Sequence, residues 1–139
     1  MVYGGRCTVD GRKETKKMNS KIGFKDLKVW QRGKKLAIMM YEISGKGKFE
    51  KDFSLRDQVR RAAVSIPSNI AEGDTLGSNK QSIRHFHISK GSCAELLTQS
   101  EIAYEIGYLS LEALKEIQEE CLGISGMLEK LINARSIVR

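Results

Sequence analysis

The chain has 139 residues, of which 40% are hydrophobic and 29% are charged, and its formal net charge is +7. This composition is typical of one soluble globular domain, and no apolar run approaches the roughly 18 residues that a membrane-spanning helix needs. A secretory signal is not expected, because the first twenty residues are polar and basic. We therefore predict a cytoplasmic protein with a single hydrophobic core.

The charge is unevenly distributed along the chain. Residues 1–20 carry a net +3, residues 21–90 a net +8 and residues 91–139 a net −4. Such an asymmetry steers association without determining the fold. It predicts either a polyanionic partner or electrostatic docking between copies of the chain.

Residues 1–20 lack hydrophobic periodicity and predict a disordered basic tail, in which Met18 could be the natural start. The domain is expected over residues 21–139. The chain contains one proline, and its glycines lie mainly in the first 50 residues, which favours long helices over strands. The expected fold class is all-α. The cysteines Cys7, Cys93 and Cys121 form no CxxC pair, so we interpret Cys93 and Cys121 as buried reduced thiols.

From Phe24 onward, apolar residues at three- and four-residue spacing predict a helix with two apolar faces. One stripe contains Leu27, Trp30, Ala37, Ile38 and Tyr41, and the other contains Val29, Leu36, Met40 and Ile43. A helix that is apolar on two faces has to bury both, and in a small bundle a neighbouring subunit often covers the second. This pattern therefore favours self-association.

The segment GKGK at residues 45–48 predicts a loop, and it lacks the GxxxxGK[ST] spacing of a phosphate-binding loop. Ser54 with Asp57 resembles a capping box, which predicts a second helix through about Gly73. Its core stripe is expected to contain Leu55, Val59, Ala62, Ile66 and Ile70. Pro67 lies inside this helix, and a kink is expected there because proline removes one backbone hydrogen bond.

Two further helices follow. Ser78 and Gln81 form a capping box for a helix that ends near Gly107, and its many small residues predict close helix contacts. Ser110 is the expected cap of the last helix. Its predicted core positions are Leu111, Leu114, Gln118, Cys121, Ser125, Leu128 and Ile132. Four helices joined by short loops predict an antiparallel up-down bundle.

No residue pattern predicts a catalytic or metal site. His85 and His87 are about 200° apart around a helix, so they cannot chelate one metal from one helix face, and we interpret both as structural or surface residues. Four-residue glutamate spacings occur without the Glu-x-x-His signature of carboxylate metal bundles. We therefore expect no enzyme activity and no cofactor.

Basic residues give a positive signal. On the first helix, Lys25, Lys28, Arg32 and Lys35 recur at three and four residues and predict a basic ridge. Arg56 and Arg60 extend positive charge to the second helix, and Lys80 and Arg84 to the third. The alternative is that these side chains only solvate helix surfaces.

Two other features do not favour a binding role. Arg61 and Glu72 could form a partly buried ion pair that organises the kinked helix or joins two subunits, because arginine's planar fork suits such pairs. The aromatic residues Tyr3, Tyr41, Tyr104, Tyr108 and Trp30 are too scattered to predict a base-stacking platform.

The motif RRAAVSIPSNIAEG stands at residues 60–73. In order around it stand DLKVWQ at 26–31, L-x-x-Q-x-R-R at 55–61, K-G-S-x-A-E-L at 90–96 and AYEIGY at 103–108. Over about residues 24–132 the chain thus resembles the bacterial 23S rRNA intervening-sequence proteins. The resemblance implies a four-helix bundle that assembles into a ring, a homopentamer, with nucleic-acid binding suspected from a basic surface.

Motif residues carried over from this resemblance are interpreted as fold or assembly residues at least as readily as ligand contacts. They are Trp30, Arg60, Arg61, Ser65, Pro67, Asn69, Glu72 and Gly73. The chain departs from the family where relatives commonly have an arginine after AEG, because it has Asp74, Thr75 and Leu76 there. His85, His87 and Ser89 also replace residues that are usually aromatic, aliphatic or alanine.

Two functions follow as hypotheses. The first is a basic homo-oligomer that binds RNA or DNA through phosphates. Its candidate contacts are Lys25, Lys28, Arg32, Lys35, Arg56, Arg60, Lys80 and Arg84. The second is a protein-interaction scaffold, or an accessory subunit that does not bind nucleic acid itself. No membrane partner is expected.

Overall fold

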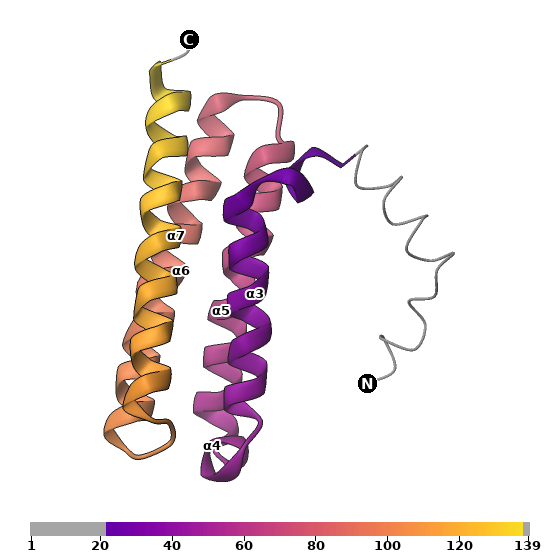
Figure 1. Ribbon diagram of the computed structural model, residues 1–139. Coiled ribbons are helices and arrows are strands. Elements are labelled where there is room, and N and C mark those ends of the chain that lie inside the picture. Colours follow the sequence, from indigo (N-terminus) through magenta and orange to yellow (C-terminus); the bar gives the residue numbers. More distant parts are fainter. Residues whose placement is uncertain (1–21, 138–139) are drawn as a thin grey trace, which may run out of the picture.

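The computed structural model describes residues 22–137 (Figure 1). Its long helices are α3 (Lys28–Ser44), α5 (Phe53–Thr75), α6 (Asn79–Glu105) and α7 (Leu111–Ile137), and its short ones are η1 (Gly23–Asp26) and α4 (Gly47–Lys51). The described residues contain no strand, which confirms the all-α prediction over this range. The predicted tail and Cys7 lie outside it.

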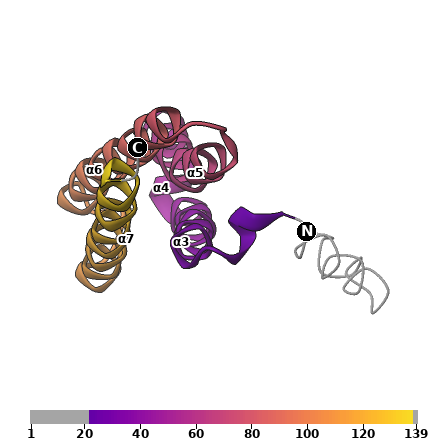
Figure 2. The same ribbon diagram turned by 90° about the horizontal axis from the view of Figure 1, so that it is seen from above.

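The long helices run antiparallel as a bundle, in the order α3, α5, α6 and α7 (Figures 1 and 2). α5 packs against both α3 and α6, and α6 also packs against α7, whereas α3 and α7 touch each other far less. The largest fully buried side chains include Phe49, Phe86, Leu36, Met40 and Ile66. Burial of these apolar groups between helices is the main stabilising contribution to such a bundle.

The predicted caps of the third and fourth long helices are confirmed. The Ser78 hydroxyl accepts a hydrogen bond from Gln81 N at 3.2 Å, and the Ser110 hydroxyl accepts one from Ala113 N at 3.1 Å. Hydroxyl acceptors at these positions satisfy backbone N–H groups that have no partner inside the helix.

The predicted cap of the second long helix is wrong. Asp52, not Ser54, caps α5, and its carboxylate accepts hydrogen bonds from Leu55 N at 3.1 Å and from Tyr108 Oη at 2.8 Å. These two bonds hold the pKa of Asp52 below its usual value. The GKGK segment at 45–48, predicted as a loop, is partly helical, because the short helix α4 already begins at Gly47 and its Phe49 is fully buried.

The first long helix begins later than predicted. Leu27 is extended, with φ −71° and ψ 125°, so it separates η1 from α3, and Lys25 belongs to η1. The predicted stripe that contains Val29 lies against the core of this chain, whereas the other stripe is divided, because Ala37 is buried and Trp30 packs on the core. Val29, Leu36 and Met40 are buried, whereas Ile38 and Tyr41 keep 51% and 47% of their surfaces exposed.

α5 continues through Pro67, which lies inside the helix. The packing around this residue accommodates the proline ring. Pro67 is buried against α3 at Gly33, where an added Cβ would lie 3.6 Å from the Pro67 Cα. On the other side, Ser89 Oγ of α6 donates a hydrogen bond to Ile66 O at 2.9 Å. Pro67 thus lies where three helices meet.

The core positions of the last helix differ by one residue from the prediction at two places. Ile117 and Ile124 are fully buried, while Gln118 and Ser125 are only partly buried. The reason is visible at Gln118, whose amide donates a hydrogen bond to Glu101 Oε2 of α6 at 2.8 Å at the edge of the interface. Leu111 is also exposed, at 47%.

Candidate functional site

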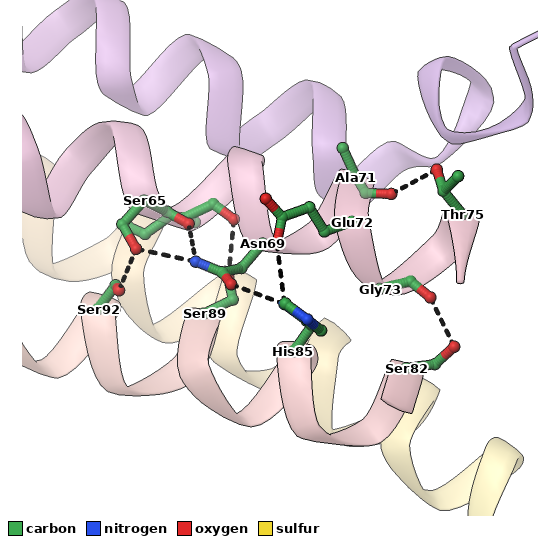
Figure 3. A network of polar contacts seen from close by, with 11 residues as sticks. Ser65, Asn69, Ala71, Glu72, Gly73, Thr75, Ser82, His85, Ser89 and Ser92 are labelled. Carbon is green, nitrogen blue, oxygen red and sulfur yellow. Dashed lines mark hydrogen bonds and ion pairs between the residues drawn. The ribbon is translucent and has the colours of Figure 1, made fainter. Parts of the chain in front are cut away.

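The motif residues of α5 form a polar network with α6 (Figure 3). Asn69 Nδ2 donates hydrogen bonds to the Ser65 carbonyl and hydroxyl at 2.9 and 3.0 Å. The Ser65 hydroxyl also accepts a bond from Ser92 Oγ at 2.8 Å. His85 Nδ1 lies 3.0 Å from Asn69 Oδ1 and 3.2 Å from Glu72 Oε1. The network joins α5 to α6 along one edge of the bundle.

The proposed pairing of Arg61 with Glu72 inside one chain is wrong. Arg61 is exposed and has no ion pair within residues 22–137, while Glu72 faces His85. Arg61 lies on the solvent side of α5, since the core side is taken by Ala62 and Ile66. A role for Arg61 between subunits stays a prediction.

Gly73 ends the motif at a point where α5 lies close against α6. A Cβ at Gly73 would lie 2.7 Å from the Phe86 ring and 3.1 Å from the Ser82 carbonyl oxygen. The Ser82 hydroxyl in turn donates a hydrogen bond to Gly73 O at 2.5 Å (Figure 3). No side chain fits at residue 73 without moving a packed ring, which explains the glycine.

Asp74, which directly follows the motif, also has an internal partner. Its carboxylate accepts a hydrogen bond from Arg135 Nη2 at 3.1 Å, which links the end of α5 to the end of α7. The Arg135 guanidinium also lies over the Phe86 ring, 5.3 Å from its centroid. These contacts join the ends of α5 and α7 and the start of α6.

The predicted basic ridge on the first helix is only partly assembled. Lys28 and Lys35 are exposed on α3, but Lys25 lies in η1 and is half-buried. Lys28 and Lys35 line a groove between α3 and α7, whose other wall carries Glu116 and Glu120. The ridge therefore faces acidic side chains of the same chain.

Arg32 is engaged by α7. Its Nε donates to Glu120 Oε1 at 2.7 Å, and this bond raises the pKa of the guanidinium. The guanidinium lies directly against Gly123, in space that a Cβ would fill. Arg32 therefore works as a bridge between α3 and α7.

Arg56 and Arg60 are likewise engaged inside the chain. Arg60 Nε donates to Ser44 Oγ at 2.8 Å, and its Nη2 donates to Tyr41 O at 3.3 Å. Arg56 donates to Asp57 Oδ1 and to Glu50 O, both at 3.1 Å. Both guanidinium groups are positioned by several contacts and still partly exposed.

The remaining candidates, Lys80 and Arg84, are exposed near the start of α6 and have no ion pair within the described range. The structure adds a set of cations that the sequence pattern did not single out: Lys46, Lys48 and Lys51, exposed around α4. Three lysines within six residues are a usable signal, but Gly45 and Gly47 on either side of Lys46 favour the interpretation as a plain loop.

The aromatic residue Trp30 lies at the edge of the core. Its ring contacts Phe24 edge-on, with centroids 5.3 Å apart, and the Lys34 ammonium lies 5.4 Å from its centroid. Beyond it, Ile38 and Tyr41 continue an exposed apolar face on α3. A second exposed set comprises Ile88 and Ile102 of α6 and Ile106, which directly follows this helix.

Cys93 and Cys121 are buried and unbridged, between α6 and α7. A hydrogen bond with Cys93, together with burial, raises the pKa of the Cys121 thiol. Within residues 22–137 no three His, Cys, Asp or Glu side chains gather as a metal site. Over the same range, no helix is both long and apolar enough to cross a membrane.

Fold and surfaces together define the chain as an all-α helical-bundle protein whose sequence motif builds a helix interface. The family model of the 23S rRNA-intervening sequence protein matches residues 25–130. The chain therefore belongs to the 23S rRNA-intervening sequence protein family, as its resemblance to that family predicted.

One solved structure with this fold is a protein of unknown function from the S23 ribosomal protein family of Bacteroides thetaiotaomicron. It is 21% identical, covers 75% of this chain and 97% of its own chain, and superposes with a TM-score of 0.69. At 21% sequence identity, this similarity establishes the shared fold and nothing more about the chain. No curated protein matches the chain.

Proposed function

We propose that this protein is a non-catalytic, self-associating helical bundle that binds RNA or DNA through phosphate contacts. The observation that carries the proposal is a set of exposed cations without ion pairs in the described part of the chain: Lys28, Lys35, Lys80 and Arg84. Phosphate groups attract such side chains without regard to base sequence, so the binding is expected to be weakly specific.

Self-association is supported by apolar side chains that the single chain leaves uncovered. Ile38 of α3 and Ile102 of α6 are about half exposed, and Ile88 of α6 is 41% exposed. Large apolar side chains left exposed on two helices favour a protein contact. The family resemblance makes a pentameric ring the expected assembly, and light scattering after gel filtration measures it. A monomer at micromolar concentration would contradict this part of the proposal.

Binding is tested by titrating a fluorescein-labelled RNA at about 50 mM and about 200 mM salt, because displacement of counterions makes phosphate binding steeply salt-dependent. We expect Lys28→Gln/Lys35→Gln to weaken binding. The matched control is Lys115→Gln/Lys130→Gln, which removes two exposed lysines from α7 and should change the affinity little. A folded, oligomeric sample that binds neither RNA nor DNA at low salt rules the proposal out.

The second candidate is a protein-interaction scaffold, and a specific observation favours it. Three of the predicted nucleic-acid contacts, Arg32, Arg56 and Arg60, are engaged inside the chain. This leaves fewer cations for phosphates than the sequence implied, while the apolar surface remains. A partner protein retained from lysate after nuclease treatment, by a sample that binds no nucleic acid, would establish this function instead.

A further inference from the structure

The end of the bundle around α4 carries two exposed aromatic rings, each with a guanidinium on it. Phe53, the first residue of α5, is 64% exposed, and Tyr41 of α3 is 47% exposed. The Arg56 guanidinium lies 4.8 Å from the Phe53 ring centroid, and that of Arg60 lies 4.5 Å from the Tyr41 centroid. A ring that stays this exposed beside a guanidinium is available to stack on a second planar group.

The two arginines are held in place from behind. Positions 53, 56 and 60 recur at three and four residues and thus share one face of α5. Arg60 is fixed by Ser44 Oγ and Tyr41 O, and Arg56 by the Glu50 carbonyl and the Asp57 carboxylate. The rings and guanidinium groups therefore form a preorganised strip, which lowers the entropy cost of binding a ligand.

Three lysines lie in and next to α4, directly before the strip in the sequence. Lys46, Lys48 and Lys51 are exposed and have no ion pair within residues 22–137. Residues 45–61 contain six cationic and three acidic side chains. Two of the acids are already engaged, because Asp52 binds Leu55 N and the Tyr108 hydroxyl, and Asp57 binds Arg56. The local field is therefore positive around two stacking surfaces.

We propose that this end of the bundle binds single-stranded RNA, with bases stacked on Phe53 and Tyr41 and phosphates contacting Lys46, Lys48 and Lys51. The inference rests on the proposed nucleic-acid binding and adds a location and a ligand class to it. Single-stranded RNA is favoured over a duplex because its bases are free to leave their own stack and lie on an aromatic ring. Cations alone would not distinguish the two.

The first test compares the affinity of the full chain for a fluorescein-labelled 12-nucleotide RNA, as a single strand and annealed to its complement. The native protein is expected to prefer the single strand, and Phe53→Ala to weaken single-strand binding by about tenfold. Phe53→Leu keeps an apolar side chain but no ring, and should weaken it as much. Phe53→Trp should restore binding. Leu122→Ala is the matched control, because Leu122 is 67% exposed on α7.

Stacking has a spectroscopic readout that electrostatic binding does not move. A 2-aminopurine base in the same RNA should lose fluorescence on binding the native protein, and keep it with Phe53→Leu. Replacing Lys46, Lys48 and Lys51 by glutamine should reduce the slope of log affinity against log salt by about 2, at about 0.7 for each phosphate that is no longer neutralised.

The outcomes separate this inference from the function on which it rests. A native protein that binds no RNA at low salt ends both. RNA binding that Phe53→Leu leaves unchanged, with the duplex bound as tightly as the single strand, overturns stacking at this end and keeps phosphate binding elsewhere. Polyglutamate bound at this end as tightly as the RNA would indicate an acidic protein partner and also overturn the inference.

Discussion

The interface between α5 and α6 and the interface between α3 and α7 are built in opposite ways. The first consists of small and hydrogen-bonding residues that bring two backbones close together, as at Gly73 and at Ser65 with Ser92. The second is open, and a single long side chain, Arg32, reaches across it to Glu120. Ser65, Asn69 and Gly73 of the family motif lie at the first interface, where helix packing accounts for them without a ligand contact.

This difference predicts where substitutions should change the stability of the bundle. A tight interface has neither spare volume nor spare hydrogen-bonding groups, so a change of one methyl group or one amide lowers the free energy of unfolding. An open interface bridged by a flexible, partly exposed side chain can rearrange, and its ion pair contributes little. Four substitutions, measured by urea unfolding, test this contrast.

The largest effect is expected for Gly73→Ala. The added methyl group would lie 2.7 Å from the Phe86 ring, which is fully buried and cannot move away freely. We expect the free energy of unfolding to fall by about 2 kcal/mol. An unchanged stability would show that α5 and α6 can separate slightly at no cost. It would contradict the proposed difference between the tight α5–α6 interface and the open α3–α7 interface.

Asn69→Ala should come next. It removes the donor to the Ser65 carbonyl and hydroxyl and the acceptor near His85, at a half-buried position. The free energy of unfolding is expected to fall by about 1 kcal/mol. Ser68→Ala, one residue away on the exposed side of the same helix, is the control and should change stability by less than about 0.5 kcal/mol. Equal destabilisation in both variants would mean that the network adds nothing.

Arg32→Gln tests the open interface. It breaks the ion pair with Glu120, in which both side chains are about one-third exposed, at 34% and 30%. Because solvent screens such a pair, we expect a destabilisation of only about 0.5 kcal/mol, and a smaller one at high salt. An effect as large as that of Gly73→Ala would show that α3 and α7 depend on this bridge.

Gly123→Ala should have the smallest effect and is the direct counterpart of Gly73→Ala. The new methyl group would also meet an occupied position, but the occupant is the end of the Arg32 side chain, which can turn away. Displacement of the guanidinium is offset by the better helix propensity of alanine, so the net change should be within about 0.5 kcal/mol of zero. Destabilisation comparable to that at Gly73 would remove the distinction between the two interfaces.

The parts of the fold that sequence predicts well are those decided within a few residues. Ser78 and Ser110 lie three residues before the N–H groups that they cap, so the local pattern was sufficient. Ser54 was predicted as the cap of α5 from its spacing to Asp57, but Asp52 caps this helix. The choice between them involves Tyr108, which is 56 residues away and donates to the Asp52 carboxylate.

The candidate site was harder to predict for the same reason. A lysine or arginine on a helix surface looks alike in sequence whether or not it has a partner. Arg32 is engaged by Glu120, 88 residues away, and Arg60 by Ser44 of another helix. Phe53 was missed because periodicity does not reveal that a ring at the first turn of α5 stays 64% exposed.

The contact of the Arg32 guanidinium with Gly123 has an evolutionary consequence. The two positions share one small volume, so a larger residue at 123 and an arginine at 32 exclude each other unless the arginine turns outward. Among related sequences, glycine at 123 should therefore accompany arginine at 32, and a shorter residue at 32 should permit alanine or serine at 123. Independent variation of the two positions would indicate that relatives hold α3 and α7 together by another route.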